Sequence, residues 1–314
     1  MTTPETDREP GRLMLLDTAS MYFRAYFGVP EIHGPDGTPV NAVRGLLDFI
    51  SRLVAEYHPT HLVCCWDDDW RPQWRVDLVP SYKSHRVVEE VESAPDVEEV
   101  PDPLGVQIPI ILEVLAAFGI RVIGAPAAEA DDVIGTLATG AGQPVDIVTG
   151  DRDLFQLVDD ELDVRVLYIA RGVGNHERVT NDWVRAKYAI DARQYADFAT
   201  MRGDASDGLP GVPGVGEKTA ATLLQRFGDI DAIIAAAHDP EAEMGPGPRG
   251  KIKAALDYLA VAPTVVAVKC DLDLDRSAMA LPRTPADPAA LADLSQRYGL
   301  DSPVERLRAV LAGG

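Results

Sequence analysis

Four short and almost uninterrupted apolar segments divide the first half of this chain. They are RLMLLD (12–17), HLVCCWD (61–67), IRVIGAP (120–126) and VDIVTGD (145–151). Such segments are typical of strands that are buried on both faces of a parallel sheet. Helical patterns lie between them, at 41–57, 107–118 and 129–139. This alternation predicts an α/β fold with a mostly parallel, twisted central sheet and helices on both faces.

Acidic residues follow the ends of the predicted strands. The set is Asp17, Asp67, Glu129, Asp131, Asp132, Asp151 and Asp153. Because the carboxyl ends of parallel strands lie at one edge of a sheet, these side chains should converge there. Any single one of them could be only a helix cap, but a cap needs one acid and not a cluster of two or three.

Carboxylates without His or Cys nearby form a hard oxygen site, which suits Mg²⁺ or Mn²⁺. Several acids around two such ions can hydrolyse a phosphodiester, since one ion generates hydroxide and the other stabilises the leaving oxygen. Asp204 and Asp207 lie three positions apart ahead of a glycine-rich turn, and we expect them to complete the cluster.

Residues 203–228 carry a second specific signal. A tight turn is predicted from Pro210, Gly211, Pro213, Gly214 and Gly216, and a helix from the pattern at 217–227. Gly214 and Gly216 leave backbone N–H groups exposed at a helix N-terminus beside Lys218, an arrangement that holds phosphate without reading bases. With a further helix expected at about 192–202, this is a helix-hairpin-helix; the alternative is an ordinary helical hairpin.

Together these motifs resemble the 5′ nuclease family of 5′–3′ exonucleases and flap endonucleases, which also forms the N-terminal domain of bacterial DNA polymerase I. The similar segments are 15–28, 65–86, 129–138, 149–158, 203–220 and 270–274, in that order along the chain. The chain looks like the free-standing form. The resemblance implies a PIN-like nuclease fold with a helical arch at about 75–106, two divalent metal ions and a potassium ion near 211–216.

The resemblance also implies roles for particular residues. The family's nine acidic ligands fall on Asp17, Asp67, Glu129, Asp131 and Asp132 around one metal ion, and on Asp151, Asp153, Asp204 and Asp207 around the other. Lys83 and Arg86 would contact the scissile phosphate, and Tyr82 would stack on a base. The alternative for the two cations is that they are solvated residues at a helix start.

Two features depart from the family pattern. Gly208 stands where the family usually has Asn, a change expected to loosen the turn. Residues 88–103 form an acidic insertion. It is either a solvated flexible segment, or it gates the strand or mimics DNA when none is bound.

The net charge of −21 argues against nucleic acid as a partner. Sixteen acidic residues, nine in the predicted metal site and seven at 88–103, account for most of it, and without them the charge would be −5. DNA affinity should therefore be modest and strongly dependent on salt.

The predicted organisation is a disordered lead-in at 1–11, a nuclease domain at 12–180 and a helical DNA-binding domain at 181–314. No apolar stretch is long enough to span a membrane. The three cysteines make neither a disulfide framework nor a zinc spacing, so we expect a reduced cytoplasmic compartment. We also expect the protein to be associated with the nucleoid.

The function predicted is that of a metal-dependent 5′–3′ exonuclease and flap endonuclease acting near junctions of single- and double-stranded DNA in replication and repair. Its expected partners are DNA with 5′ flaps, nicks or free 5′ ends, and RNA in RNA–DNA hybrids; we expect a monomer. One rival is a DNA-structure binding module without catalysis, which the complete set of acids disfavours. The other is a small PIN-type ribonuclease, which leaves the hairpin and the arch unexplained.

Overall fold

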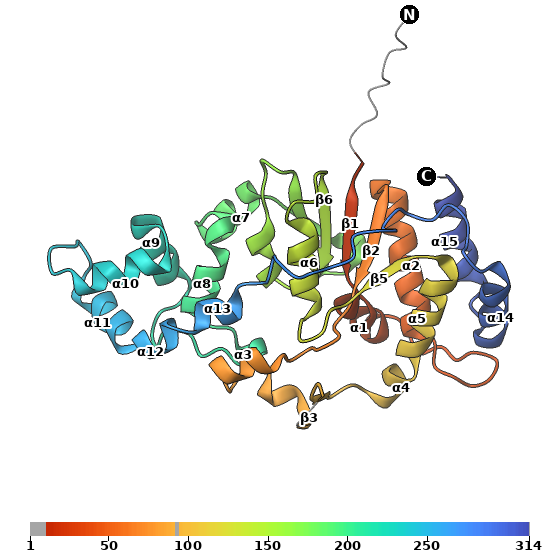
Figure 1. Cartoon of the computed structure of the whole chain (residues 1–314), viewed down its shortest axis with the longest axis horizontal. Coiled ribbons are helices and arrows are strands. Elements are labelled where there is room, and N and C mark those ends of the chain that lie inside the picture. The colour runs from red at the N-terminus through yellow and green to blue at the C-terminus, as the bar shows by residue number, and fades with distance from the viewer. Residues whose placement is uncertain (1–10, 92–93, 314) are drawn as a thin grey trace, which may run out of the picture.

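The structure is a computed structural model that describes residues 11–91 and 94–313. The predicted lead-in at 1–11 lies outside this range except for its last residue. A six-stranded sheet forms the centre of the molecule, in the order β5-β2-β1-β6-β7-β8 (Figure 1). Its strands are β1 (Leu13–Asp17), β2 (His61–Cys65), β5 (Arg121–Ile123), β6 (Val145–Thr149), β7 (Val164–Tyr168) and β8 (Glu177–Val179). All pairs are parallel except β7 with β8, so the predicted fold class is confirmed.

β1 lies at the middle of the sheet and all five of its residues are buried. It pairs with β2 on one side, where Leu13 is opposite His61, and with β6 on the other. Successive side chains of a strand point to opposite faces. Leu15 therefore belongs to one hydrophobic core and Leu16 to a second core on the other face.

Helices cover both faces, as the alternating pattern predicts. The face of Leu16 packs against α1 (Thr18–Gly28), α2 (Asn41–Tyr57) and α5 (Gln107–Phe118). The opposite face packs against α6 (Ala130–Ala138), through Val133 and Leu137 among others. The predicted helices at 41–57 and 107–118 have these same bounds, whereas Glu129 and Thr139 are the caps of α6.

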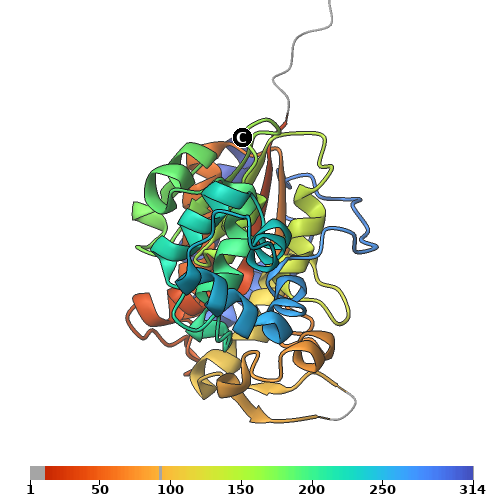
Figure 2. The same cartoon turned by 90° about the vertical axis from the view of Figure 1, so that its left-hand side faces the viewer.

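The segment expected to form a helical arch is built largely from other elements. It contains α3 (Gln73–Leu78), a single 3₁₀ turn at Ser84–Arg86, a ribbon of β3 (Val87–Glu89) and β4 (Val97–Glu98), and α4 (Asp102–Gly105). β3 and β4 are antiparallel. Figure 2 shows this segment in orange along the lower edge of the molecule. We call residues 75–106 the arch segment.

A group of helices follows the sheet and forms one end of the molecule (Figure 1). These are α7 (Asn181–Tyr188), α8 (Tyr195–Arg202), α9 (Glu217–Phe227), α10 (Ile230–His238), α11 (Pro246–Ala254), α12 (Leu256–Leu259) and α13 (Ala262–Val266). The glycine-rich turn joins α8 to α9. In the part of the chain that the structure describes, no helix is both long and apolar enough to cross a bilayer.

The last two helices return to the opposite end of the molecule (Figure 1). These are α14 (Pro288–Tyr298) and α15 (Asp301–Gly313), and they pack on α5 and α2. Leu307 joins the core that contains Leu46, and Arg306 holds Asp48 at 2.7 Å. The expected division at residue 180 assigns both helices to the DNA-binding domain, whereas in space they complete the α/β part.

Candidate active site

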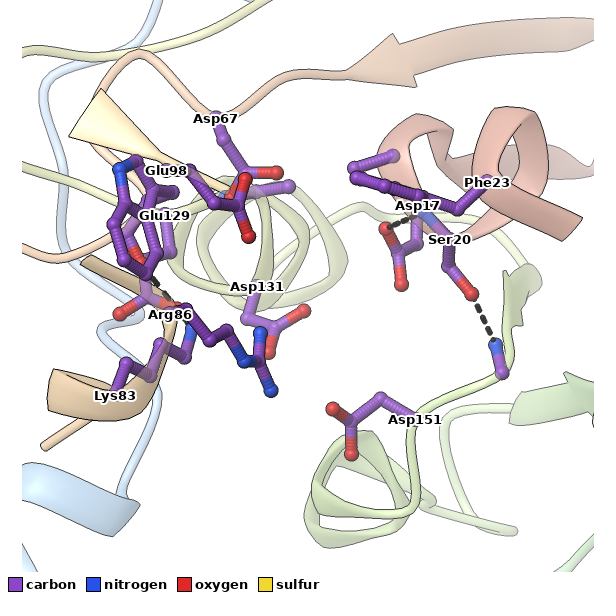
Figure 3. Close-up of a pocket in the computed structure, with 14 residues that line it drawn as sticks. Asp17, Ser20, Phe23, Asp67, Lys83, Arg86, Glu98, Glu129, Asp131 and Asp151 are labelled. Atoms are coloured by element: carbon purple, nitrogen blue, oxygen red, sulfur yellow. Dashed lines mark hydrogen bonds and ion pairs between the residues drawn. The ribbon is translucent and has the colours of Figure 1, made fainter. Parts of the chain in front are cut away.

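A cleft of about 240 Å³ opens at the carboxyl edge of the sheet. Five of the nine predicted metal ligands line it: Asp17, Asp67, Glu129, Asp131 and Asp151. Figure 3 shows their carboxylates around one common space, with Lys83 and Arg86 reaching in from the arch segment. The convergence predicted from the strand ends is therefore present for these five residues.

Asp17 ends β1 and is also the N-cap of α1, because its Oδ1 accepts a hydrogen bond from the backbone N–H of Ser20 at 3.1 Å. Its Oδ2 accepts a bond from the hydroxyl of Thr149 at 2.6 Å. Burial raises the pKa of Asp17 to about 7, against the effect of the Thr149 bond, and the charge of Asp67 adds to the rise. The cleft therefore disfavours a further negative charge at this position.

Asp67 and Asp131 lie on either side of the start of α6. Asp67 Oδ1 accepts a hydrogen bond from the backbone N–H of Ala130 at 2.8 Å. Burial raises the pKa of Asp67, and it raises that of Asp131 well above the usual range together with the charges of Asp151 and Asp17. The repulsion among these acids is what a bound cation would relieve.

Glu129 is held by three donors from the arch segment. Arg75 Nη1 lies 3.0 Å from its Oε1, and the hydroxyl of Tyr82 donates to the same oxygen at 2.7 Å. Lys83 Nζ donates to Oε2. Burial disfavours the charged ammonium, but Glu129, Tyr82 and Asp207 together outweigh this effect, and the pKa of Lys83 is raised well above its usual range.

Asp132, predicted as a metal ligand, lies away from the cleft. It is fully buried, and Arg75 binds both of its oxygens, at 2.7 and 2.8 Å. The backbone N–H groups of Glu129 and Lys269 also donate to it. Both oxygens are thus occupied, because consecutive residues at the start of a helix point in different directions and Asp132 faces the protein. In this structure Asp132 positions Arg75.

The second group of acids lies beside the first. The backbone N–H of Asp153 donates to Asp151 Oδ1 at 2.8 Å. Burial raises the pKa of Asp153 well above the usual range, with Asp151 the next cause, and it raises that of Asp207 as well. Asp204 Oδ2 lies 3.2 Å from Arg202, so it already has a cationic partner.

One observation on these residues disagrees with bound metal ions, and two agree with them. Across residues 11–91 and 94–313, no three His, Cys, Asp or Glu side chains stand close enough together to hold an ion as they lie. The donors are nevertheless hard carboxylate oxygens. Asp153 Oδ1 is buried and has no hydrogen-bond partner within the described chain. A buried acceptor left without a donor is unfavourable, and a cation would satisfy it.

The prediction that Tyr82 stacks on a base does not agree with the structure. Its ring is 4% exposed and belongs to a hydrophobic core. Stacking needs an open ring face, and only the hydroxyl of Tyr82 reaches the site, through Glu129. A tyrosine next to Lys83 in sequence therefore supports the acid and not the substrate.

Arg86 and the turn before it connect the arch segment to the second acidic group. Arg86 Nη2 donates to Ser206 O at 2.8 Å and lies 3.3 Å from Asp207 Oδ1. The backbone N–H of Lys83 donates to Asp207 O at 2.9 Å. Both cations predicted to contact the phosphate thus hold predicted metal ligands.

The same contact explains Gly208. Its φ is +69°, and a Cβ there would meet the carbonyl oxygen of Ser81 at 2.0 Å. The hydroxyl of Ser81 donates to Gly208 O at 2.7 Å. The glycine therefore allows close docking of the arch segment, which is a reason for glycine here besides the expected loosening of the turn.

The two glycines predicted to hold phosphate in the hairpin between α8 and α9 differ in their backbone conformation. Gly214 has a φ of +76°, whereas Gly216 has an ordinary φ of −99° and caps α9. No atom lies within 4 Å of a Cβ built on Gly216, so packing among the described residues does not require glycine there. Lys218 is exposed on the first turn of α9.

Comparison with known proteins identifies the family to which the chain belongs. A family profile described as 5′-3′ exonuclease, N-terminal resolvase-like domain, matches residues 12–189, and one described as 5′-3′ exonuclease, C-terminal SAM fold, matches 190–289. The chain belongs to the 5′–3′ exonuclease family. It is therefore a nuclease and a hydrolase, which confirms the family and the class of enzyme predicted from the sequence.

Individual relatives agree. A protein of Streptomyces coelicolor named 5′-3′ exonuclease is 58% identical over 95% of this chain and 99% of its own. A protein of the same name from Mycobacterium tuberculosis is 51% identical over 95% of this chain and 97% of its own. The solved T5 D15 protein, co-crystallised with metal ions, has a TM-score of 0.64 at 17% identity, covering 96% of this chain and 99% of that one. This last likeness shows the fold.

The exonuclease has residues in the cleft, and one behind it, that sequence reasoning missed. Arg75 is the buried partner of two acids, and Glu98 lines the cleft from β4. Ser20, Phe23 and Trp70 line it too. An arginine in a short apolar helix is a signal that could have pointed to Arg75. No feature of the sequence distinguishes Glu98 from the other acids of the insertion. Of those acids, Asp96 is ion-paired with Arg71 at 2.5 Å, so the insertion is not simply a solvated segment.

Proposed function

We propose that this exonuclease hydrolyses DNA phosphodiester bonds near junctions of single- and double-stranded DNA, with two divalent metal ions, as a 5′–3′ exonuclease and flap endonuclease. The observation that carries the proposal is the convergence of Asp17, Asp67, Asp131 and Asp151 on one cleft. Burial and repulsion by neighbouring acids raise the pKa values of Asp17, Asp67 and Asp131, which is how a site built for cations behaves without them.

The ligands proposed for the ions are carboxylates that line the cleft and carboxylates of the second group of acids. They are Asp17, Asp67, Glu129 and Asp131 for one ion, and Asp151, Asp153, Asp204 and Asp207 for the other. Ions bound there would supply an activated water and stabilise the leaving oxygen. Related folds support this: the T5 D15 protein was crystallised with metal ions, and as a flap endonuclease with DNA and metal ions.

The residues of the arch segment would bind the substrate phosphate. Lys83 and Arg86 are the two cations that reach the cleft, and both are fixed by carboxylates and by backbone contacts to the second acidic group. Fixed cations stabilise developing negative charge without first reorganising. We therefore assign them to the scissile phosphate and its neighbour.

The hairpin would hold the duplex arm of the DNA. Gly216 and Lys218 offer a backbone N–H group and an ammonium at the start of α9, a combination that contacts phosphate whatever the sequence. We further propose Mg²⁺ or Mn²⁺ as the metal, a potassium ion near 211–216, RNA in RNA–DNA hybrids as a further partner, a monomeric protein, and association with the nucleoid.

The test is a cleavage assay with three 5′-labelled DNA substrates: a flap, a nicked duplex and a blunt duplex. Each is incubated with Mg²⁺, with Mn²⁺ or with EDTA, and the products are sized on a gel. We expect short 5′ products from the flap and the nick, and none with EDTA. Asp293→Asn, an exposed change from acid to amide on α14, is the control variant and should cleave as the wild type does. Equal cleavage of all three substrates, or cleavage in EDTA, would refute the proposal.

A further inference from the structure

Lys251 on α11 reaches across to the hairpin between α8 and α9. Its Nζ donates a hydrogen bond to the carbonyl oxygen of Gly214 at 2.7 Å. A Cβ built on Gly214 would lie 3.1 Å from Lys251 Cε and 3.2 Å from Nζ. The end of the lysine side chain therefore lies directly against the turn that is proposed to hold phosphate.

The placement of lysines in this chain is uneven. The whole sequence contains six lysines against a net charge of −21, and three of them, Lys218, Lys251 and Lys253, lie on α9 and α11. Arg249 on α11 has another role, since its guanidinium donates to the carbonyl oxygen of Ala237 at the end of α10 and to that of Ala242 in the loop that follows. Within residues 11–91 and 94–313, no ion pair engages Lys218, Lys251 or Lys253.

An ammonium has three N–H donors, and the Gly214 carbonyl uses one of those of Lys251. The remaining two are available to an anion. Because the hydrogen bond already fixes the side chain, little rotamer freedom is left to lose when an anion binds. A free surface lysine lacks this advantage.

We propose that Lys251 is a second phosphate-binding cation of the hairpin, and that it acts with Lys218 on the sugar–phosphate backbone of the duplex arm. The inference rests on the proposed function as a DNA nuclease. It extends the DNA-binding element from the glycine-rich turn to α11, a helix that the hairpin motif does not include. The contact carries charge and no base recognition, so it contributes equally to all sequences.

The alternative is that Lys251 only ties α11 to the turn. The two roles differ in salt dependence, because each phosphate contact adds about 0.9 to the slope of log K against log salt.

Dissociation constants for a 5′-flap DNA would be measured by fluorescence anisotropy in Ca²⁺, between about 50 and 200 mM KCl. The variants are Lys251→Gln, which keeps a donor for Gly214 O, Lys251→Ala and Lys251→Arg. Arg308→Ala, which removes one charge from the exposed side of α15, is the control.

We expect Lys251→Gln and Lys251→Ala to lower the slope by about one and to weaken binding several-fold, roughly as for a single lost phosphate contact. Lys251→Arg should retain the wild-type slope, and so should the control. A wild-type slope in Lys251→Gln would overturn the inference even if Lys251→Ala binds poorly, since the lysine would then be only a structural tie. If the wild-type protein neither binds nor cleaves DNA, the proposed function fails instead.

Discussion

Lys83 and Glu129 form a buried ion pair in the cleft, although 46 positions separate them in the sequence. One belongs to the arch segment and the other caps α6. The pair therefore joins the cation proposed to act on the substrate to an acid proposed to hold metal.

Replacing Lys83 by Ala should lower the single-turnover rate of flap cleavage by about 10²-fold or more, the range for loss of one electrostatic stabiliser. The affinity for flap DNA in Ca²⁺ should change little, because the charge grows mainly in the transition state. Lys187→Ala, on exposed α7, is the control. A loss of affinity with an unchanged rate at saturation would show that Lys83 only docks DNA.

Asp151→Asn combined with Asp153→Asn should abolish cleavage in Mg²⁺ and in Mn²⁺ while the fold persists. Because Asp153 is buried and the charge of Asp151 adds to the cost of ionising it, the variant in EDTA should melt at a higher temperature than the wild type. Gel assays and thermal melting followed by circular dichroism check the two outcomes. Turnover near the wild-type level would contradict the assignment of these residues as ligands.

Arg75→Met should destabilise the protein by about 3–5 kcal/mol, the usual effect of removing one partner from a buried ion pair. Glu129 and Asp132 would both lose their arginine, and the carbonyl of Val265 would lose its donor. Urea unfolding measures the change, with Arg308→Ala as the exposed control. A loss below about 1 kcal/mol, typical of surface pairs, would mean that other groups satisfy these acids.

The stability of the protein in EDTA should fall as the pH rises. The pKa of Asp17 is raised from 3.8 to about 7, so the folded state keeps a proton that the unfolded state loses. The stabilising contribution is present below about pH 4 and is lost as the pH passes through about 7. Melting temperatures between about pH 5 and 8 should decline less steeply in Asp17→Asn than in the wild type. Parallel curves for the two proteins would show that Asp17 does not titrate in this range.

Gly216→Ala should lower stability by no more than about 1 kcal/mol, since a Cβ there meets nothing and the φ is ordinary, although alanine is a poorer helix N-cap than glycine. Binding of duplex DNA should nevertheless weaken, because the methyl group would occupy the space proposed for a phosphate. Anisotropy and thermal melting separate the two effects. Unchanged binding would remove Gly216 from the DNA contact.

Gly208→Ala should instead destabilise the protein, because its Cβ meets Ser81 O at 2.0 Å.

The sheet and its acidic edge could be predicted because both follow from local patterns. A buried parallel strand is a continuous apolar run, and its carboxyl end has a defined place in the sheet. Asp17 and Asp151 are therefore found where expected, at the ends of β1 and β6. The bounds of α2 and α5 follow equally from periodicity.

The direction of individual side chains could not be predicted in the same way. Asp131 faces the cleft and Asp132 faces Arg75, a difference that depends on how α6 is rotated on the sheet. The burial of Tyr82 depends on packing of the arch segment against α6, and the placement of Glu98 on the β3–β4 ribbon. These contacts join segments far apart in the sequence, where no local pattern reports them.

The return of α14 and α15 to the α/β part has a consequence for synthesis. The apolar side of α2, which is complete once residue 57 has been made, receives Leu307 and Leu311 only when the last described residues emerge from the ribosome. The DNA-binding helices are made in between. Tertiary closure of the catalytic part therefore cannot precede synthesis of the helical part, and a nascent chain stalled before α15 would expose a hydrophobic surface to which chaperones bind.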